Sequence, residues 1–122
     1  MDQDKFNPNP LAASPTAYPL FYRSYSRKIH DSVSNERESW EEVTARTVGG
    51  IAKLANLTQE EVDLLTEMQL SLKSIVSGRW LWVGGTDWVE KPENFYGAYN
   101  CSSTRIVDWE SFALLMNLAM MG

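Results

Sequence analysis

The chain has 122 residues, of which 43% are hydrophobic, so it is long and apolar enough for one domain with a core. Its 11 basic and 16 acidic residues give a net charge of -5, which argues against a general nucleic-acid-binding protein with a basic face. A single cysteine excludes an internal disulfide, and we expect neither a signal peptide nor a membrane-spanning segment. These features predict a cytoplasmic protein without a membrane partner.

The first 28 residues divide into two segments of different composition. Residues 1–19 contain four of the five prolines and are expected to form an extended tail, because proline fixes φ and lacks an N–H donor. Residues 20–28 alternate aromatic and basic side chains. Such a cluster can stack on bases and hold phosphates, but in a short segment of an acidic chain we favour rings packed on the protein and charges in water. No nucleic-acid partner is therefore expected.

Two helices are predicted next, over residues 36–54 and residues 59–74. Asn35 is the expected cap of the first helix. The first apolar face consists of Trp40, Val43, Thr47, Val48, Ile51 and Leu54, and the second of Val62, Leu65, Met68, Leu72 and Ile75. A capping box from Thr58 to Glu61 marks the start of the second helix, and the short connection between the helices predicts an antiparallel hairpin.

Pairs of glycines occur at two places: inside the first predicted helix and after the apolar segment of residues 79–83. Gly49-Gly50 weakens the first helix by roughly 1 kcal/mol per glycine, and close approach of another backbone would explain the pair. Gly84-Gly85 follows residues 79–83, which are apolar on both faces and are expected to form a short buried strand. This second pair would let a ligand or another backbone come close.

The remaining chain is predicted to form a loop, a strand and a helix. The loop covers residues 87–97, and the strand covers residues 98–107 and contains Cys101. Asp108 is the expected cap of a last helix that is apolar on nearly all sides. A helix of this kind is normally buried in a larger fold.

Few residues carry recognisable chemistry. His30 and Cys101 are the only soft metal ligands and are not spaced as a site, so no metal is expected. Gly84-Gly85-Thr86 lacks the lysine of a phosphate-binding P-loop. Composition alone favours Cys101 as a small buried hydrophobe over a redox thiol, because a reactive setting is not visible in a sequence.

Five motifs in order change that assessment. The chain resembles the N-terminal part of adenosylcobalamin-dependent (class II) ribonucleotide reductases of the monomeric ribonucleoside-triphosphate reductase type, from about residue 20 onward. Each motif is weak alone, but the ordered set is specific. The motifs are Phe21-Tyr22-Arg23-Ser24-Tyr25-Ser26-Arg27, Glu38-Ser39-Trp40, Ser77-Gly78-Arg79-Trp80-Leu81-Trp82-Val83-Gly84-Gly85-Thr86, Gly97-Ala98-Tyr99-Asn100-Cys101 and Asp108-Trp109.

The resemblance implies a ten-stranded α/β barrel preceded by a helical region. This chain would then be mainly α with two short β-strands: residues 1–19 as the tail, 20–76 as the helical region and 77–122 as the start of the barrel. In such enzymes a thiyl radical takes the ribose 3′-hydrogen, and two other cysteines reduce the 2′ position and become a disulfide. Cys101 corresponds to the first of these reducing cysteines.

The resemblance also implies substrate contacts and partners. Thr86 would lie near the substrate phosphates and Asn100 along the ribose. The ligands would be a ribonucleoside triphosphate and adenosylcobalamin, with no cofactor-binding residue assignable in this chain, and the reductant would be thioredoxin. The radical cysteine and the disulfide partner would belong to the remainder of the reductase chain, so this fragment alone is expected to be inactive.

One residue departs from the family pattern, and one alternative interpretation remains. Val76 stands where the family often has proline before Ser-Gly-Arg. This difference affects only the turn expected at Ser77-Gly78. The alternative is a small helical interaction module that binds a partner through the aromatic-basic cluster of residues 22–27, with Cys101 as a structural buried cysteine. The sequence leaves both open.

Overall fold

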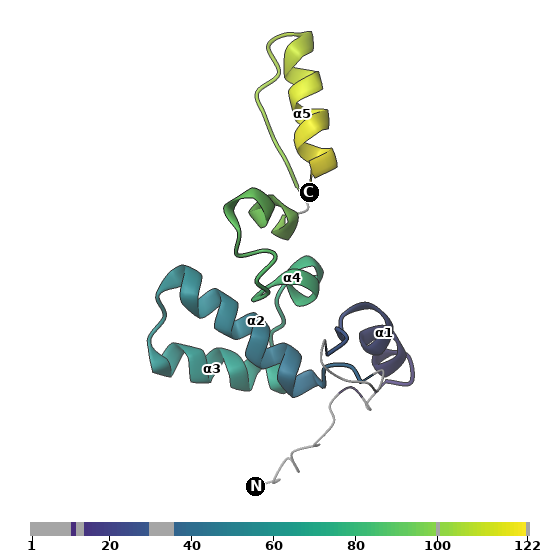
Figure 1. Ribbon diagram of the computed structural model, residues 1–122, viewed down its shortest axis with the longest axis vertical. Helices are drawn as coiled ribbons and strands as arrows, with labels where there is room; N and C mark the ends of the chain where they lie inside the picture. The colour runs from purple at the N-terminus through teal and green to yellow at the C-terminus, as the bar shows by residue number, and fades with distance from the viewer. Residues whose placement is uncertain (1–10, 12–13, 30–35, 100, 122) are drawn as a thin grey trace, which may run out of the picture.

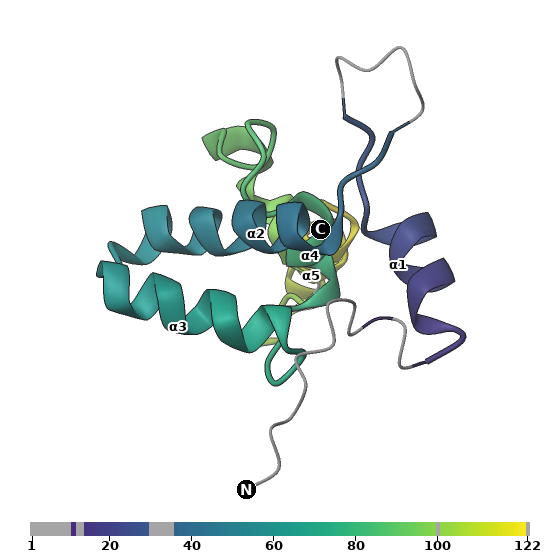
Figure 2. The same ribbon diagram turned by 90° about the horizontal axis from the view of Figure 1, so that it is seen from below.

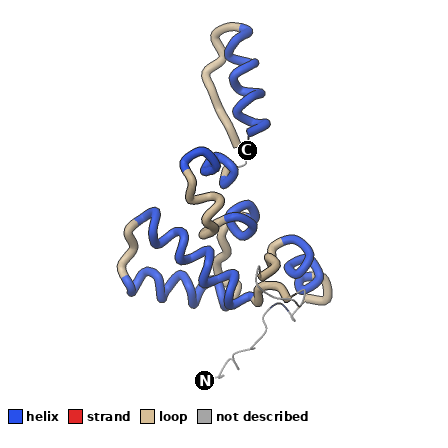
Figure 3. Tube along the Cα trace, in the orientation of Figure 1, coloured by secondary structure: helices blue, strands red, loops and turns tan. Residues whose placement is uncertain are grey.

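The computed structural model describes residues 11, 14–29, 36–99 and 101–121, and it confirms a mainly helical chain. Within these residues no β-strand forms, and the tube drawing shows only helices and loops (Figure 3). The elements are α1 (Ala17–Ser24), α2 (Trp40–Ala55), α3 (Gln59–Leu70), α4 (Gly78–Val83), the 3₁₀ helix η2 (Pro92–Ala98) and α5 (Trp109–Met121). None of these helices is long and apolar enough to cross a bilayer.

Helices α2 and α3 form the predicted antiparallel hairpin, and they lie side by side in both ribbon views (Figures 1 and 2). The capping box at Thr58 is confirmed: its hydroxyl accepts from the Glu61 N–H, and its own N–H donates to the Glu61 carboxylate. The polar contact between the helices was not predicted. Gln69 is buried and donates to the hydroxyl oxygens of Thr47 at 2.8 Å and Thr44 at 3.3 Å.

The predicted start of α2 was four residues too early. Ser39, rather than Asn35, caps the helix and forms a capping box with Glu42. Asn35 itself lies outside the described residues. Residues 36–38 instead run antiparallel to residues 27–29, through the Ile29 N–H to the Glu36 carbonyl at 3.1 Å and a bridge between Lys28 and Arg37.

The predicted end of the second helix was too late. Helix α3 stops at Leu70, and Leu72 takes a left-handed φ of 57° that a helix cannot continue through. Leu72 and Ile75 are therefore exposed rather than part of the apolar face.

The N-terminal region is not extended throughout. Helix α1 begins at Ala17, inside the predicted tail, and Pro19 lies in its first turn, where proline is tolerated. Leu11 is buried and joins a core cluster with Phe21, Trp40, Val43 and Leu81. The rings of Phe21 and Trp40 meet edge to face, with centroids 5.5 Å apart. Residues 1–10 and 12–13 of the predicted tail lie outside the described part.

Both predicted strands were wrong. Residues 79–83 belong to α4, which Ser77 caps by accepting a hydrogen bond from the Trp80 N–H. Trp82 is half exposed, so this segment is not buried on both faces. Ala98 ends η2, and residues 101–106 have no regular structure. Nothing in the described part pairs with them, and an unpaired extended segment does not make a sheet.

The last helix was predicted correctly. Asp108 accepts from the Ser111 N–H at 2.8 Å, and α5 follows from Trp109. In Figure 1 the segment of residues 101–121 leads away from the α2–α3 hairpin. Its apolar side chains are exposed: Trp109, Phe112, Leu114, Met116, Leu118 and Met120.

Candidate functional site

The two glycine pairs meet each other. A Cβ on Gly50 would lie 2.7 Å from the backbone nitrogen of Gly85, whereas one on Gly49 would meet nothing within 4 Å. Gly85 also has φ of 69° and lies against the Arg46 carbonyl. The expected close approach at both pairs is therefore one contact, in which the turn after α4 packs directly on α2.

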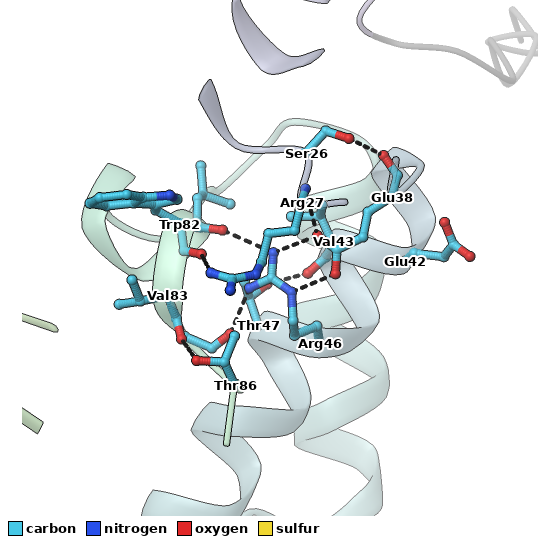
Figure 4. A network of polar contacts seen from close by, with 12 residues as sticks. Ser26, Arg27, Glu38, Glu42, Val43, Arg46, Thr47, Trp82, Val83 and Thr86 are labelled. Carbon is cyan, nitrogen blue, oxygen red and sulfur yellow. Dashed lines mark hydrogen bonds and ion pairs between the residues drawn. The ribbon is translucent and has the colours of Figure 1, made fainter. Parts of the chain in front are cut away.

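An arginine of α2 holds this junction together. The Arg46 guanidinium pairs with both carboxylate oxygens of Glu38, at 2.7 and 2.9 Å (Figure 4). It also donates to the Gly84 carbonyl at 2.7 Å and the Leu81 carbonyl at 3.1 Å. These carbonyls lie at the C-terminal end of α4, where a positive charge is favourable. Glu38 thus orients Arg46, and the hydrogen bonds of Arg46 hold α4 in place. A helix of six residues is too short to be stable by itself.

Thr86 is part of the same junction. Its hydroxyl donates to the Val83 carbonyl at 2.6 Å (Figure 4). The same oxygen accepts from the Val89 N–H at 3.4 Å. Its proton therefore already has an acceptor in the main chain of α4, and a phosphate oxygen would have to replace that carbonyl.

Cys101 is a free and exposed cysteine. The prediction that it is buried was wrong, and so was the prediction that a strand holds it, because residues 101–106 have no regular structure. Asn100 lies outside the described residues. Within the described part no hydrogen bond joins Thr86 to Cys101.

The aromatic-basic cluster contributes to an open cavity of about 330 Å³, here called the basic pocket. Sequence reasoning found the cluster but not the contributions of Arg37 and Trp82, which come from elsewhere in the chain. The lining residues are Arg23, Ser24, Ser26, Arg27, Lys28, Arg37 and Trp82. Four of them are basic and none is acidic.

Another cavity, of about 440 Å³, is mainly apolar and lies between α2 and η2. Leu54, Trp80, Phe95 and Tyr99 are among its lining residues. The described residues contain no group of three or more histidine, cysteine or acidic side chains that could hold a metal ion.

The groups with shifted pKa values line neither the basic pocket nor the apolar cavity of about 440 Å³. The Ser111 hydroxyl and N–H lower the pKa of Asp108, and the Thr58 N–H and hydroxyl lower that of Glu61, since each stabilises the carboxylate. A hydrogen bond to Glu90 raises the pKa of Lys53. Comparison of the chain with protein-family models, with curated proteins and with solved structures gave no match.

Proposed function

We propose that this chain is the N-terminal part of an adenosylcobalamin-dependent ribonucleoside-triphosphate reductase. The ordered set of five motifs supports the proposal, and the single structural observation that carries it is the exposed thiol of Cys101. A thiol that reduces a substrate must reach both the substrate and a partner cysteine, which a buried structural cysteine could not do.

The proposed role of Cys101 is to supply one of two reducing thiols. The two thiols together lose two electrons and two protons and form a disulfide. The ribonucleotide loses its 2′-hydroxyl as water and gains a hydrogen at C2′. Reduction of the disulfide by thioredoxin restores both thiols for the next turnover. The two cysteine Cα atoms must come to about 4.4–6.8 Å for the disulfide to form.

The other assigned residues would position the substrate. Phosphate oxygens accept hydrogen bonds, so Thr86 would donate its proton to them in place of the Val83 carbonyl. Asn100 would lie along the ribose. Because residues 101–106 have no regular structure here, the proposal requires that they become ordered as a barrel strand when the rest of the reductase packs on α5.

The cofactor is not assigned to this chain. The cavities at the α2, α4 and η2 surface hold about 190 and 440 Å³, and a corrin ring with its adenosyl group is far larger than a ligand that fills such spaces. Neither of these two cavities therefore fits adenosylcobalamin. In the proposal the cofactor, the radical cysteine and the partner cysteine belong to the remainder of the reductase, and this chain alone is inactive. The complete enzyme would act in the cytoplasm.

The test uses the complete protein that contains this sequence, purified from its source and identified by peptide mass spectrometry. It is incubated with a ribonucleoside triphosphate, adenosylcobalamin and reduced thioredoxin, and the nucleotides are separated by chromatography. We expect 2′-deoxyribonucleotide that depends on both cofactor and reductant. If the only native product is a stable 122-residue chain without such activity, the interaction-module alternative replaces the reductase.

A further inference from the structure

We propose that the basic pocket binds a small molecule that carries a triphosphate chain, with Trp82 beside it to stack on a base where the ligand has one. This proposal rests on the contacts of the basic pocket and not on the reductase. The pocket lies where α1, the paired segments 27–29 and 36–38, and α4 meet.

The two central arginines of the pocket are held in place by the main chain. Arg27 donates to the Trp82 carbonyl at 3.0 Å, and Arg37 donates to the carbonyls of Ser26 at 2.7 Å and Tyr22 at 3.0 Å. The Arg37 guanidinium also lies over the Tyr22 ring, 5.2 Å from its centroid. A guanidinium has five N–H donors, so each arginine keeps donors beyond these bonds. Such fixed forks are suited to phosphate oxygens.

The charge of the pocket is not neutralised by its own lining. Arg23, Arg27, Lys28 and Arg37 are all cationic at neutral pH, and no carboxylate lines the cavity. Two carboxylates flank Arg37 along the paired segments: Glu36 is exposed, and the oxygens of Glu38 are taken by Arg46 and by the Arg27 N–H at 3.1 Å. In a chain with net charge -5, such a concentration of positive charge favours a multiply charged anion.

Size and surroundings favour a small ligand over a nucleic acid. A volume of about 330 Å³ lies at the small end of the range for small-molecule sites. The acidic remainder of the chain would repel a long phosphate backbone. Trp82 lines the pocket and is 51% exposed, so its side chain is accessible to a base that stacks on it.

The test is isothermal titration calorimetry of the full chain with inorganic tripolyphosphate and, separately, with ATP. The variant combines Arg23→Gln with Lys28→Gln, because both side chains are exposed. We expect each ligand to bind the wild type and to lose at least tenfold in affinity in the variant. The matched control combines Lys73→Gln with Lys91→Gln, which removes the same charge from exposed positions elsewhere and should leave both affinities unchanged. Far-UV circular dichroism verifies that all variants stay folded.

A second variant, Trp82→Leu, distinguishes a nucleotide from inorganic polyphosphate as the ligand. If the ligand is a nucleotide, ATP loses about 5- to 160-fold in affinity while tripolyphosphate is unchanged, since stacking is worth about 1–3 kcal/mol. Equal affinities of the wild type and Trp82→Leu for both ligands assign the pocket to inorganic polyphosphate. The proposal is overturned if neither ligand binds, or if the two charge variants lose affinity equally.

Discussion

The backbone of Gly85 fills the place that a side chain at Gly50 would take, with the Gly85 Cα 2.8 Å from the ideal Cβ position. This contact joins the turn after α4 to the middle of α2. It places Thr86, the residue after Gly85, on the helical hairpin. The position of Thr86 therefore depends on two residues without side chains.

The first prediction concerns this contact. Gly50→Ala should destabilise the chain by about 1–3 kcal/mol, because the added methyl group overlaps main-chain atoms that cannot move aside freely. Gly49→Ala is the matched control and should stabilise it by up to about 1 kcal/mol, since the site is open and alanine favours a helix. Urea denaturation measures both. Equal effects of the two substitutions would show that the Gly50–Gly85 contact is absent.

The second prediction concerns Arg46. Arg46→Lys should lower the free energy of unfolding by about 1–3 kcal/mol, because an ammonium cannot pair with both Glu38 oxygens and also bind the carbonyls of Leu81 and Gly84. Lys53→Gln removes an exposed ion pair with Glu90 and should change thermal stability little. A thermal scan compares the variants, and an Arg46→Lys variant as stable as wild type would contradict the account of α4.

The third prediction concerns pH and the start of α5. Because the Ser111 hydrogen bonds lower the folded-state pKa of Asp108, its cap stabilises α5 fully above the unfolded pKa and loses that effect as pH falls through the folded value. In Ser111→Ala the Asp108 pKa should rise, as followed by NMR of the side-chain carboxyl. Glu61, whose pKa is lowered by Thr58, is the internal control and should not move. An unchanged Asp108 titration in this variant would exclude Ser111 as the cause.

The fourth prediction concerns the apolar surface of α5. Trp109 is 86% exposed and Met116 is 60% exposed, and patches of this kind associate with other apolar surfaces. The isolated chain should bind a hydrophobic dye and self-associate in sedimentation velocity runs at rising concentration. Met116→Glu should reduce both signals, whereas Leu64→Glu, at an isolated exposed leucine of α3, should not. A dye-free monomer at all concentrations would count against a packing role for α5.

Local signals explain what the sequence could predict. The Thr58 capping box, the α2–α3 hairpin and the Asp108 cap all depend on residues within a few positions of each other, and all were found. The glycine pairs predicted that another backbone comes close to each of them. They did not predict that the two pairs contact each other, because a sequence does not show which segments meet. The strand at residues 79–83 was wrong because Arg46, more than 30 residues earlier, binds the end of that segment as a helix. The basic pocket also combines distant residues, and only its aromatic-basic part has a local signal.

The most direct test of the reductase proposal is turnover of the complete reductase with Cys101→Ser, beside Ser102→Ala as a control at the neighbouring exposed position. With thioredoxin as reductant we predict that Cys101→Ser makes no deoxyribonucleotide in repeated turnover, while the radical measured by electron paramagnetic resonance still forms, because radical and reducing thiols are different residues. Ser102→Ala should remain active. Wild-type turnover by Cys101→Ser would contradict the proposal and leave Cys101 without a role in reduction.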